Sequence, residues 1–201
     1  MQTTESISTR RSVKHYQADF AMPEKDIRKI MELALLSPTS FNMQNWRFLV
    51  ITDPAIREQI YGAAFNQAQV IEASFVVLLC ADLLAHEREP ARYWKDASPQ
   101  VAEVIVPMIE SFYRDQPQLQ RDEAHRSCGI AAQTIMLAAR SMGYDSCPMV
   151  GFDPAAVASI VNLPADYCIS LMITVGKALK PAHPRPGQLP YDEVVFSDRF
   201  A

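Results

Sequence analysis

Residues 37–48, SPTSFNMQNWRF, concentrate hydroxyl and carboxamide side chains directly after a helical pattern. Short loops rich in Ser, Thr and Asn leave backbone N–H and C=O groups accessible beside the side-chain amides. Such groups recognise a planar heterocycle that carries alternating hydrogen-bond donors and acceptors. The alternative is a helix end followed by a turn, with Trp46 packed in the core. This segment alone leaves both interpretations open.

A basic cluster, Arg10-Arg-Ser-Val-Lys14, lies near the N-terminus. If the segment is helical or a tight turn, Arg10 and Lys14 lie one turn apart on the same face. A guanidinium, an ammonium and the Ser12 hydroxyl then suit a phosphate group. The alternative is a solvated basic face on an N-terminal helix.

Two further segments carry weaker signals. Asn66-Gln-Ala-Gln69 offers carboxamides ahead of an apolar run, although such side chains usually face solvent. In Cys147-Pro-Met-Val-Gly-Phe-Asp153, Pro148 restricts the backbone and Gly151 permits a close backbone approach to a ligand or another chain. The alternative for the second segment is an ordinary connection between a strand and a helix.

Several common sites are missing from the sequence. The six glycines form no G-x-G, which excludes the Rossmann fingerprint and the P-loop. No nucleophile elbow is present for Ser/His/Asp chemistry. His125 and Cys128 are three residues apart and suit a nucleophile pair or two metal ligands, but no third ligand or orienting group is evident. We therefore expect no metal site.

Composition is that of one globular protein. The chain has 201 residues, almost half of them apolar, and a net charge of -4, which does not indicate a nucleic-acid surface. No signal peptide or membrane-spanning run is evident. Four separated cysteines indicate reduced thiols and a cytoplasmic location.

Apolar periodicity predicts an α+β or mixed α/β protein with one domain, residues 1–201. Pro107 is expected to kink or break its helix, and residues 83–98 to be irregular or weakly helical. The proline-rich segment 177–201 reads as an extended tail that packs on another surface, for which a second subunit is one candidate. The expected helices are 24–36, 54–64, 101–112, 121–142 and one opening at Asp153-Pro154, and the expected strands are 48–52, 75–80 and 169–175.

Taken together and in this order, these segments resemble the FMN-dependent nitroreductase family. The resemblance rests on Arg-Arg-Ser-x-Lys, SPTSFNMQNWRF, FNQAQ before FVVLLCAD, SCPMVGFDP, and a tail with LPYDEVV, so that it spans nearly the whole chain. It implies an α+β nitroreductase-like fold with a central, mostly antiparallel sheet flanked by helices. It also implies a domain-swapped homodimer that binds FMN at the subunit interface.

The resemblance also implies which residues bind the flavin. In the family, the residues that correspond to 10–14 hold the phosphate, the ribityl chain and the pyrimidine side of the flavin. The loop that corresponds to 38–44 reaches the flavin largely from the partner subunit. The carboxamide pair lies near the polar edge of the ring, and a backbone N–H behind the flavin approaches N5. The corresponding residues are Arg10, Arg11, Ser12 and Lys14; Pro38, Thr39, Ser40, Asn42 and Gln44; Asn66 and Gln69; and Pro148, Met149, Val150 and Gly151.

This sequence departs from the family pattern at two places. Val150 stands where some members carry Glu, but the expected contact there is made by the backbone. The tail reads Pro186-Gly-Gln-Leu-Pro190 where basic residues are usual, so Arg185 and Lys177 are the nearest replacements for a phosphate contact.

The activity implied is an oxidoreductase that uses NAD(P)H to reduce nitroaromatics, quinones or similar small acceptors by a ping-pong hydride relay. Phe112 or Tyr113 is a candidate gate for the acceptor, against the alternative of core packing. Specialised flavin chemistry such as reductive dehalogenation, a non-catalytic flavin-binding sensor, and a flavin-free interaction protein remain as alternatives.

Overall fold

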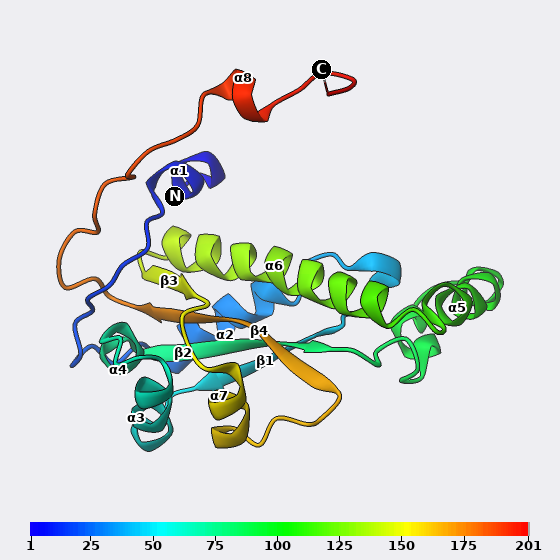
Figure 1. Ribbon diagram of the computed structural model, residues 1–201, viewed down its shortest axis with the longest axis horizontal. Helices are drawn as coiled ribbons and strands as arrows, with labels where there is room; N and C mark the ends of the chain where they lie inside the picture. The colour runs from blue at the N-terminus through cyan, green and yellow to red at the C-terminus, as the bar shows by residue number, and fades with distance from the viewer. Residues whose placement is uncertain (201) are drawn as a thin grey trace.

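The centre of the computed structural model, which describes residues 1–200, is a four-stranded sheet with the order β1-β2-β4-β3 (Figure 1). Every neighbouring pair of strands is antiparallel, as the resemblance implied. The strands are β1 (Trp46–Ile51), β2 (Phe75–Asp82), β3 (Asp145–Met149) and β4 (Tyr167–Gly176).

Helices cover both faces of the sheet, because β2 is apolar on both sides and all eight of its residues are buried. Val77 and Leu79 face one core with α2 and α6, while Val76 and Leu78 face another with α3 and α7 (Figure 1). The α+β architecture with flanking helices is therefore confirmed. The helices are α1 (Thr3–Thr9), α2 (Glu24–Ala34), α3 (Pro54–Ala63), α4 (Gln69–Glu72), α5 (Pro99–Tyr113), α6 (Pro117–Ser141), α7 (Pro154–Ile160) and α8 (Tyr191–Val194).

Helix α5 continues through Pro107, so the expectation of a break there was wrong. Proline removes one backbone hydrogen bond, the one to the carbonyl of Glu103. Both Pro107 and Glu103 are exposed, and water can satisfy that carbonyl. The preceding segment is irregular as expected, with turns and a 3-10 helix, η2 (Pro90–Trp94).

The sequence analysis did not predict the short helices α1, α4 and α8 or the strand β3. Strand β3 contains Pro148, which normally argues against a strand. It is tolerated because β3 lies at the edge of the sheet, where one side of the strand needs no ladder partner. Its register pairs Met149 with Met172 and Asp145 with Gly176.

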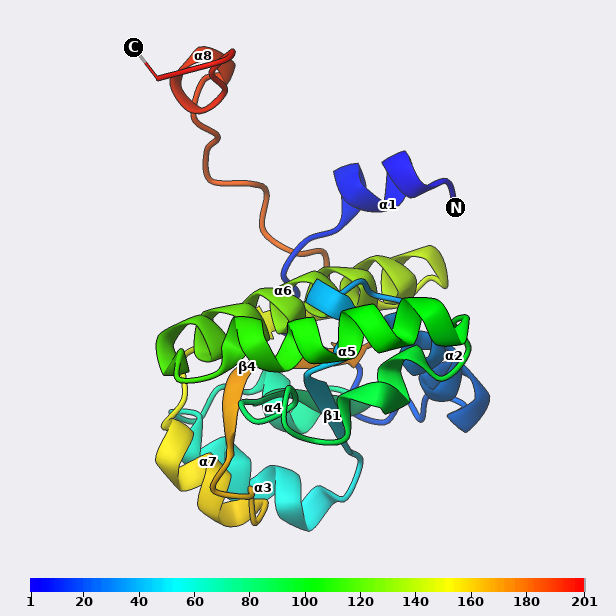
Figure 2. The same cartoon turned by 90° about the vertical axis from the view of Figure 1, so that its right-hand side faces the viewer.

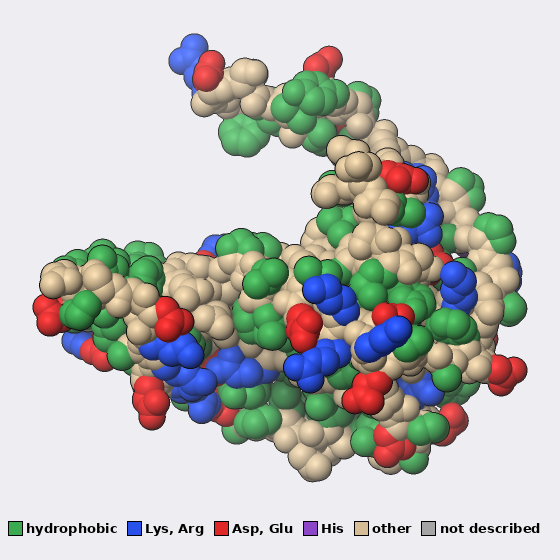
Figure 3. All heavy atoms as spheres, turned by 180° about the vertical axis from the view of Figure 1, so that it is seen from behind, with side chains coloured by type: hydrophobic (Ala, Val, Ile, Leu, Met, Phe, Trp, Pro, Cys, Tyr) green, Lys and Arg blue, Asp and Glu red, His purple; other side chains and the backbone are tan. Residues whose placement is uncertain are grey.

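The tail after Gly176 leaves the sheet in extended form, with the short α8 near its end (Figure 2). Figure 3 shows it as an arm that stands off the body, with apolar side chains on the arm and on the surface below it. The exposed apolar side chains of the arm include Leu189, Tyr191, Val194 and Phe196. Within residues 1–200, no helix has the length and apolarity that a membrane crossing requires.

Candidate functional site

The N-terminal segment after α1 is extended, so the condition of a helix or tight turn over Arg10–Lys14 is not met. Ser12 forms a parallel bridge with Ser146 of β3, and the Val13 N–H donates to the Ser146 carbonyl at 3.1 Å. Side chains of an extended segment alternate between two sides. Val13 is therefore buried, while Ser12 and Lys14 are exposed. The segment still presents Arg10, Ser12 and Lys14 together, with a period of two rather than one helical turn.

Arg10, Ser12 and Lys14 lie near the Cys147 thiol, and Arg185 joins them from the tail. We call Arg10, Ser12, Lys14 and Arg185 the cationic site. Burial raises the pKa of the Cys147 thiol, and the neighbouring Lys14, Arg10 and Ser12 counteract part of that rise. The Arg185 guanidinium donates to the Arg10 carbonyl at 3.4 Å. Residues from the N-terminus, β3 and the tail thus meet at one place.

Within residues 1–200, the charge of the cationic site is not paired with a carboxylate. Burial is the largest cause that lowers the pKa of Arg10, and the positive charges of Arg185 and Arg11 lower it further. One terminal nitrogen of the Arg10 guanidinium is buried without a hydrogen-bond partner. Among residues 1–200, no carboxylate forms an ion pair with Arg10, Lys14 or Arg185. These unpaired cations and the unpartnered buried nitrogen suit a phosphate group.

Two basic residues expected to bind the cofactor have other hydrogen-bond partners. Arg11 donates to the carbonyls of Ser8 and Arg10, both at 2.8 Å, at the end of α1. Lys177 donates to the Gly143 carbonyl at 3.0 Å, beyond the end of α6. Of the two tail candidates for a phosphate contact, Arg185 is the one that lies beside Arg10.

The turn after α3 contacts the end of β3, which connects two of the predicted segments. Gln67 donates to the Gly151 carbonyl at 2.6 Å, and the buried Gln69 donates to the Gln67 side chain at 3.0 Å. Asn66 is exposed. Gln67 was not among the predicted site residues, although the same carboxamide-rich segment contains it.

At the end of β3, the chain opens toward solvent directly beside this turn. Val150 is 78% exposed, whereas the preceding Met149 is buried in the core. A Cβ added at Gly151 would lie 3.3 Å from the Gln67 amide nitrogen, so the glycine permits this close contact. Pro148 and Gly151 therefore shape a surface next to the cationic site.

The second predicted group, residues 38–44, is a strained loop held by its neighbours. Phe41, Asn42 and Gln44 have positive φ values of 50°, 53° and 45°. Non-glycine residues rarely adopt this conformation, which costs on the order of 1–3 kcal/mol each unless the surroundings enforce it. Thr39 supports the loop by accepting from the Gln44 N–H at 2.9 Å. Strain of this kind is concentrated at functional sites.

Helix α5 and η2 supply the remaining support for the 38–44 loop. The Tyr113 hydroxyl donates to the Ser40 hydroxyl at 3.0 Å, and the Asn42 amide donates to the Tyr93 carbonyl at 2.7 Å. Tyr113 is 1% exposed and belongs to the core, whereas Phe112 is 52% exposed and contacts the Phe41 ring. Of the two candidate gates, Phe112 is thus the one at the surface.

The cationic site and the 38–44 loop do not meet within one chain. Figure 1 places the N-terminal segment and β3 toward one end of the long axis, and α5 with the 38–44 loop toward the other. A ligand that contacts both groups therefore needs two copies of the chain.

His125 does not pair with Cys128 in the manner considered from the sequence. Its Nδ1 lies 2.9 Å from the Ser170 hydroxyl, and its Nε2 lies 3.6 Å from the Cys168 thiol. Burial lowers the pKa of His125. Across residues 1–200, no three His, Cys, Asp or Glu side chains gather as a metal site.

Comparisons with known proteins identify the family of the chain. Residues 7–177 match the family described as the nitroreductase family. Protein DrgA of Synechocystis sp. is 48% identical over 97% of this chain and 95% of its own, and an oxygen-insensitive NADPH nitroreductase of Helicobacter pylori is 28% identical over 94% of each. A candidate nitroreductase from Exiguobacterium sibiricum, solved in complex with FMN, superposes with a TM-score of 0.91 at 28% identity and covers 98% of this chain and 97% of that one. The chain belongs to the nitroreductase family.

Proposed function

We propose that this protein is an FMN-dependent oxidoreductase that uses NAD(P)H to reduce nitroaromatics, quinones or similar small acceptors. The observation that carries the proposal is the unpaired charge of the cationic site, where a buried guanidinium nitrogen of Arg10 has no partner. The phosphate of FMN is an anion that these cations can bind. The resemblance to an FMN complex over 98% of the chain supports the same cofactor.

Arg10, Arg185 and Ser12 are assigned to the phosphate and ribityl end of the cofactor, with Lys14 beside them toward the ring. The exposed Val150 and Gly151 backbone lies behind the ring, and Gln67 and Gln69 fix the adjacent turn. Bound FMN supplies hydride acceptance and donation, so the chain needs no catalytic nucleophile of its own. The work of the protein is to bind, to orient and to limit access to the ring.

The active form is a homodimer in which the 38–44 loop and Phe112 of one subunit reach the cationic site of the other. The separation of these two groups within one chain supports this arrangement. An exposed apolar stripe on α5 supports it further, since Val101, Val104, Met108 and Phe112 follow helical spacing on one face. The tail, with its exposed aromatic and aliphatic side chains, packs on the partner subunit.

Four free cysteines suit a cytoplasmic location for this dimer.

The first test is the visible spectrum of the purified protein, followed by identification of the pigment that heating releases. We expect the bands of oxidised flavin and free FMN in the supernatant. Steady oxidation of NADH or NADPH with a nitroaromatic or quinone acceptor then separates an enzyme from a non-catalytic flavin-binding sensor. A colourless protein that also fails to bind added FMN would refute the proposal and favour a flavin-free interaction protein.

A further inference from the structure

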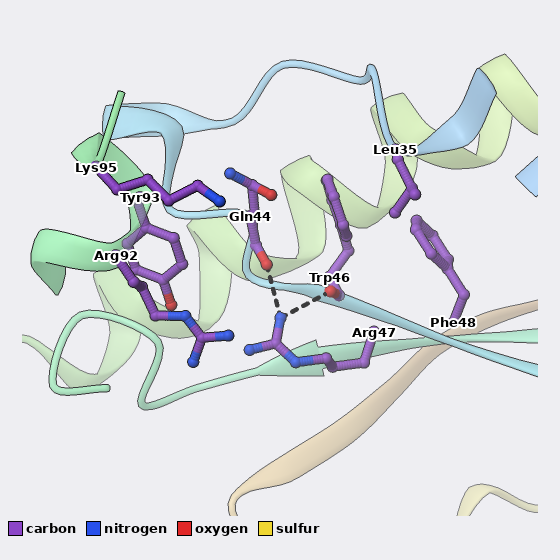
Figure 4. Close-up of a pocket in the computed structure, with 8 residues that line it drawn as sticks. All are labelled: Leu35, Gln44, Trp46, Arg47, Phe48, Arg92, Tyr93 and Lys95. Carbon is purple, nitrogen blue, oxygen red and sulfur yellow. Dashed lines mark hydrogen bonds between the residues drawn. The ribbon is translucent and has the colours of Figure 1, made fainter. Parts of the chain in front are cut away.

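A solvent-open cavity lies beside the 38–44 loop, at the start of β1 (Figure 4). Its volume is about 570 Å³. Residues of the loop, β1 and η2 form its walls, together with Leu35 at the end of α2. We call it the basic pocket, and its lining residues are Leu35, Gln44, Trp46, Arg47, Phe48, Arg92, Tyr93 and Lys95.

The basic pocket carries positive charge in a protein whose net charge is -4. No Asp or Glu of the described residues lines it. Arg47 is paired with the buried Asp82 at 2.8 Å. Arg92 and Lys95 are exposed and form no ion pair within residues 1–200. The pocket is therefore suited to a ligand with negative charge.

Aromatic rings form the other walls of the basic pocket. Trp46 and Phe48 stack with their ring centroids 5.0 Å apart and an interplanar angle of 22°. The Arg92 guanidinium lies over the Tyr93 ring, 5.7 Å from its centroid. Trp46 is 5% exposed, and its indole N–H has no hydrogen-bond partner. Trp46 and Tyr93 belong to the core, and the partly exposed Phe48 offers an apolar ring beside the cations. An apolar ring next to unpaired cations suits a nucleotide, whose base is planar and whose phosphates are anionic.

The side chains converge on a common space. In Figure 4, the guanidinium groups of Arg47 and Arg92 point toward one another, and Lys95 extends toward the Gln44 amide. The Arg47 guanidinium also donates to the Gln44 carbonyl at 2.7 Å. Cations from β1 and η2 thus face the same cavity from different elements.

The basic pocket is attached to the loop that we assign to the flavin of the partner subunit. Gln44 belongs to both. The Trp94 indole N–H donates to the Phe41 carbonyl at 3.0 Å, and the Asn42 amide donates to the Tyr93 carbonyl at 2.7 Å. These bonds hold η2 against the 38–44 loop. A ligand in the pocket therefore lies next to a loop with a defined position at the proposed flavin site.

We propose that the basic pocket binds the adenosine phosphate half of the NAD(P)H donor, with Arg92 and Lys95 as the phosphate ligands. This inference rests on the proposed function and names the subsite that distinguishes a dinucleotide from a simple hydride donor. A dinucleotide carries its phosphates away from the hydride-donating ring. It can therefore place that ring at the flavin while the phosphates occupy this pocket.

The test compares donors with and without phosphates on the FMN-loaded protein. The double variant Arg92→Ala/Lys95→Ala should raise the KM for NADH and NADPH at least tenfold, since two charged phosphate contacts are lost. With 1-benzyl-1,4-dihydronicotinamide, which has no phosphate, the kinetics and the FMN content should not change. Arg28→Ala/Lys29→Ala on α2 is the matched control, because it removes the same charge from an exposed surface.

The outcomes separate this inference from the proposed function. If the wild-type protein shows no turnover with any donor, the proposed function itself is refuted. An unchanged KM for both dinucleotides in Arg92→Ala/Lys95→Ala, with turnover intact, overturns the inference alone. A raised KM for 4-nitrobenzoate but not for a neutral nitroaromatic, with the dinucleotides unaffected, also overturns it, because the pocket then serves an anionic acceptor. Competitive inhibition by ADP that weakens in the double variant supports it.

Discussion

Arg10→Ala tests the cationic site most directly. The guanidinium is partly buried, has one unpartnered nitrogen and lies beside two other arginines, Arg185 and Arg11. In the protein without cofactor, this charge has no carboxylate partner within residues 1–200. Its removal should therefore cost little folding stability, while it removes the proposed contact to the FMN phosphate.

The expected magnitude follows from the kind of contact that is lost. A hydrogen bond to a charged group contributes about 1.5–3 kcal/mol. Every 1.4 kcal/mol corresponds to about a tenfold change in affinity, so the Kd for FMN should rise roughly 10- to 150-fold. Arg10→Lys keeps the charge but loses the bidentate geometry, so its Kd for FMN should lie between those of the wild type and of Arg10→Ala.

The assay is a titration of the cofactor-free protein with FMN, followed by the quenching of flavin fluorescence. The thermal midpoint of each cofactor-free variant is measured in parallel. Arg28→Ala is the matched control, since Arg28 is exposed and pairs with Glu32 on the surface of α2. We expect a weaker Kd with an unchanged midpoint for Arg10→Ala, and neither change for the control.

Two results would contradict the reasoning about Arg10. An FMN affinity equal to that of the wild type would remove Arg10 from the phosphate site. A large fall in the thermal midpoint of the cofactor-free variant would show that Arg10 stabilises the fold, which its unpaired charge argues against.

Three further predictions concern stability and assembly. Burial raises the pKa of the Cys128 thiol from 9.0 to about 12, so the unfolded chain loses this proton first. The free energy of unfolding should fall as pH rises between these values, and Cys128→Ala should make the fall shallower in urea titrations. Asp153→Ala removes the N-cap of α7, which accepts from the Ala155 and Ala156 N–H groups at 2.9 and 3.0 Å, and should cost about 1 kcal/mol in the same titrations. Deletion of residues 186–201 should weaken the proposed dimer in sedimentation at micromolar concentration, and a dimer of unaltered strength would exclude the tail from the interface.

Local patterns in the sequence predicted most of the regular structure. The run Phe75–Cys80 predicted a buried strand, and β2 is buried on both faces. The apolar stripe of residues 24–36 predicted α2, and Asp153-Pro154 predicted the start of α7. These predictions hold because each pattern depends on contacts within a few residues or on simple burial of one face.

The candidate site was predicted less completely. The set Arg10, Ser12 and Lys14 was chosen correctly as a group that lies together, but from the wrong conformation. Its extended backbone depends on Ser146, which is more than a hundred residues away in the sequence. Strand β3 and Gln67 were missed for the same reason, because their roles appear only through β4 and Gly151.

The sequence by itself predicted β1, β2 and β4, the main helix faces and the phosphate-binding side chains Arg10, Ser12 and Lys14, since these follow from side-chain chemistry and short-range periodicity. Arg185 was expected from the family resemblance. The tertiary structure decided which of these residues meet. It separated the cationic site from the 38–44 loop, and it brought Arg92 and Lys95 to Trp46 and Gln44 in the basic pocket. Such tertiary contacts depend on hydrogen bonds and packing between segments that are distant in the chain, and no local sequence pattern encodes them.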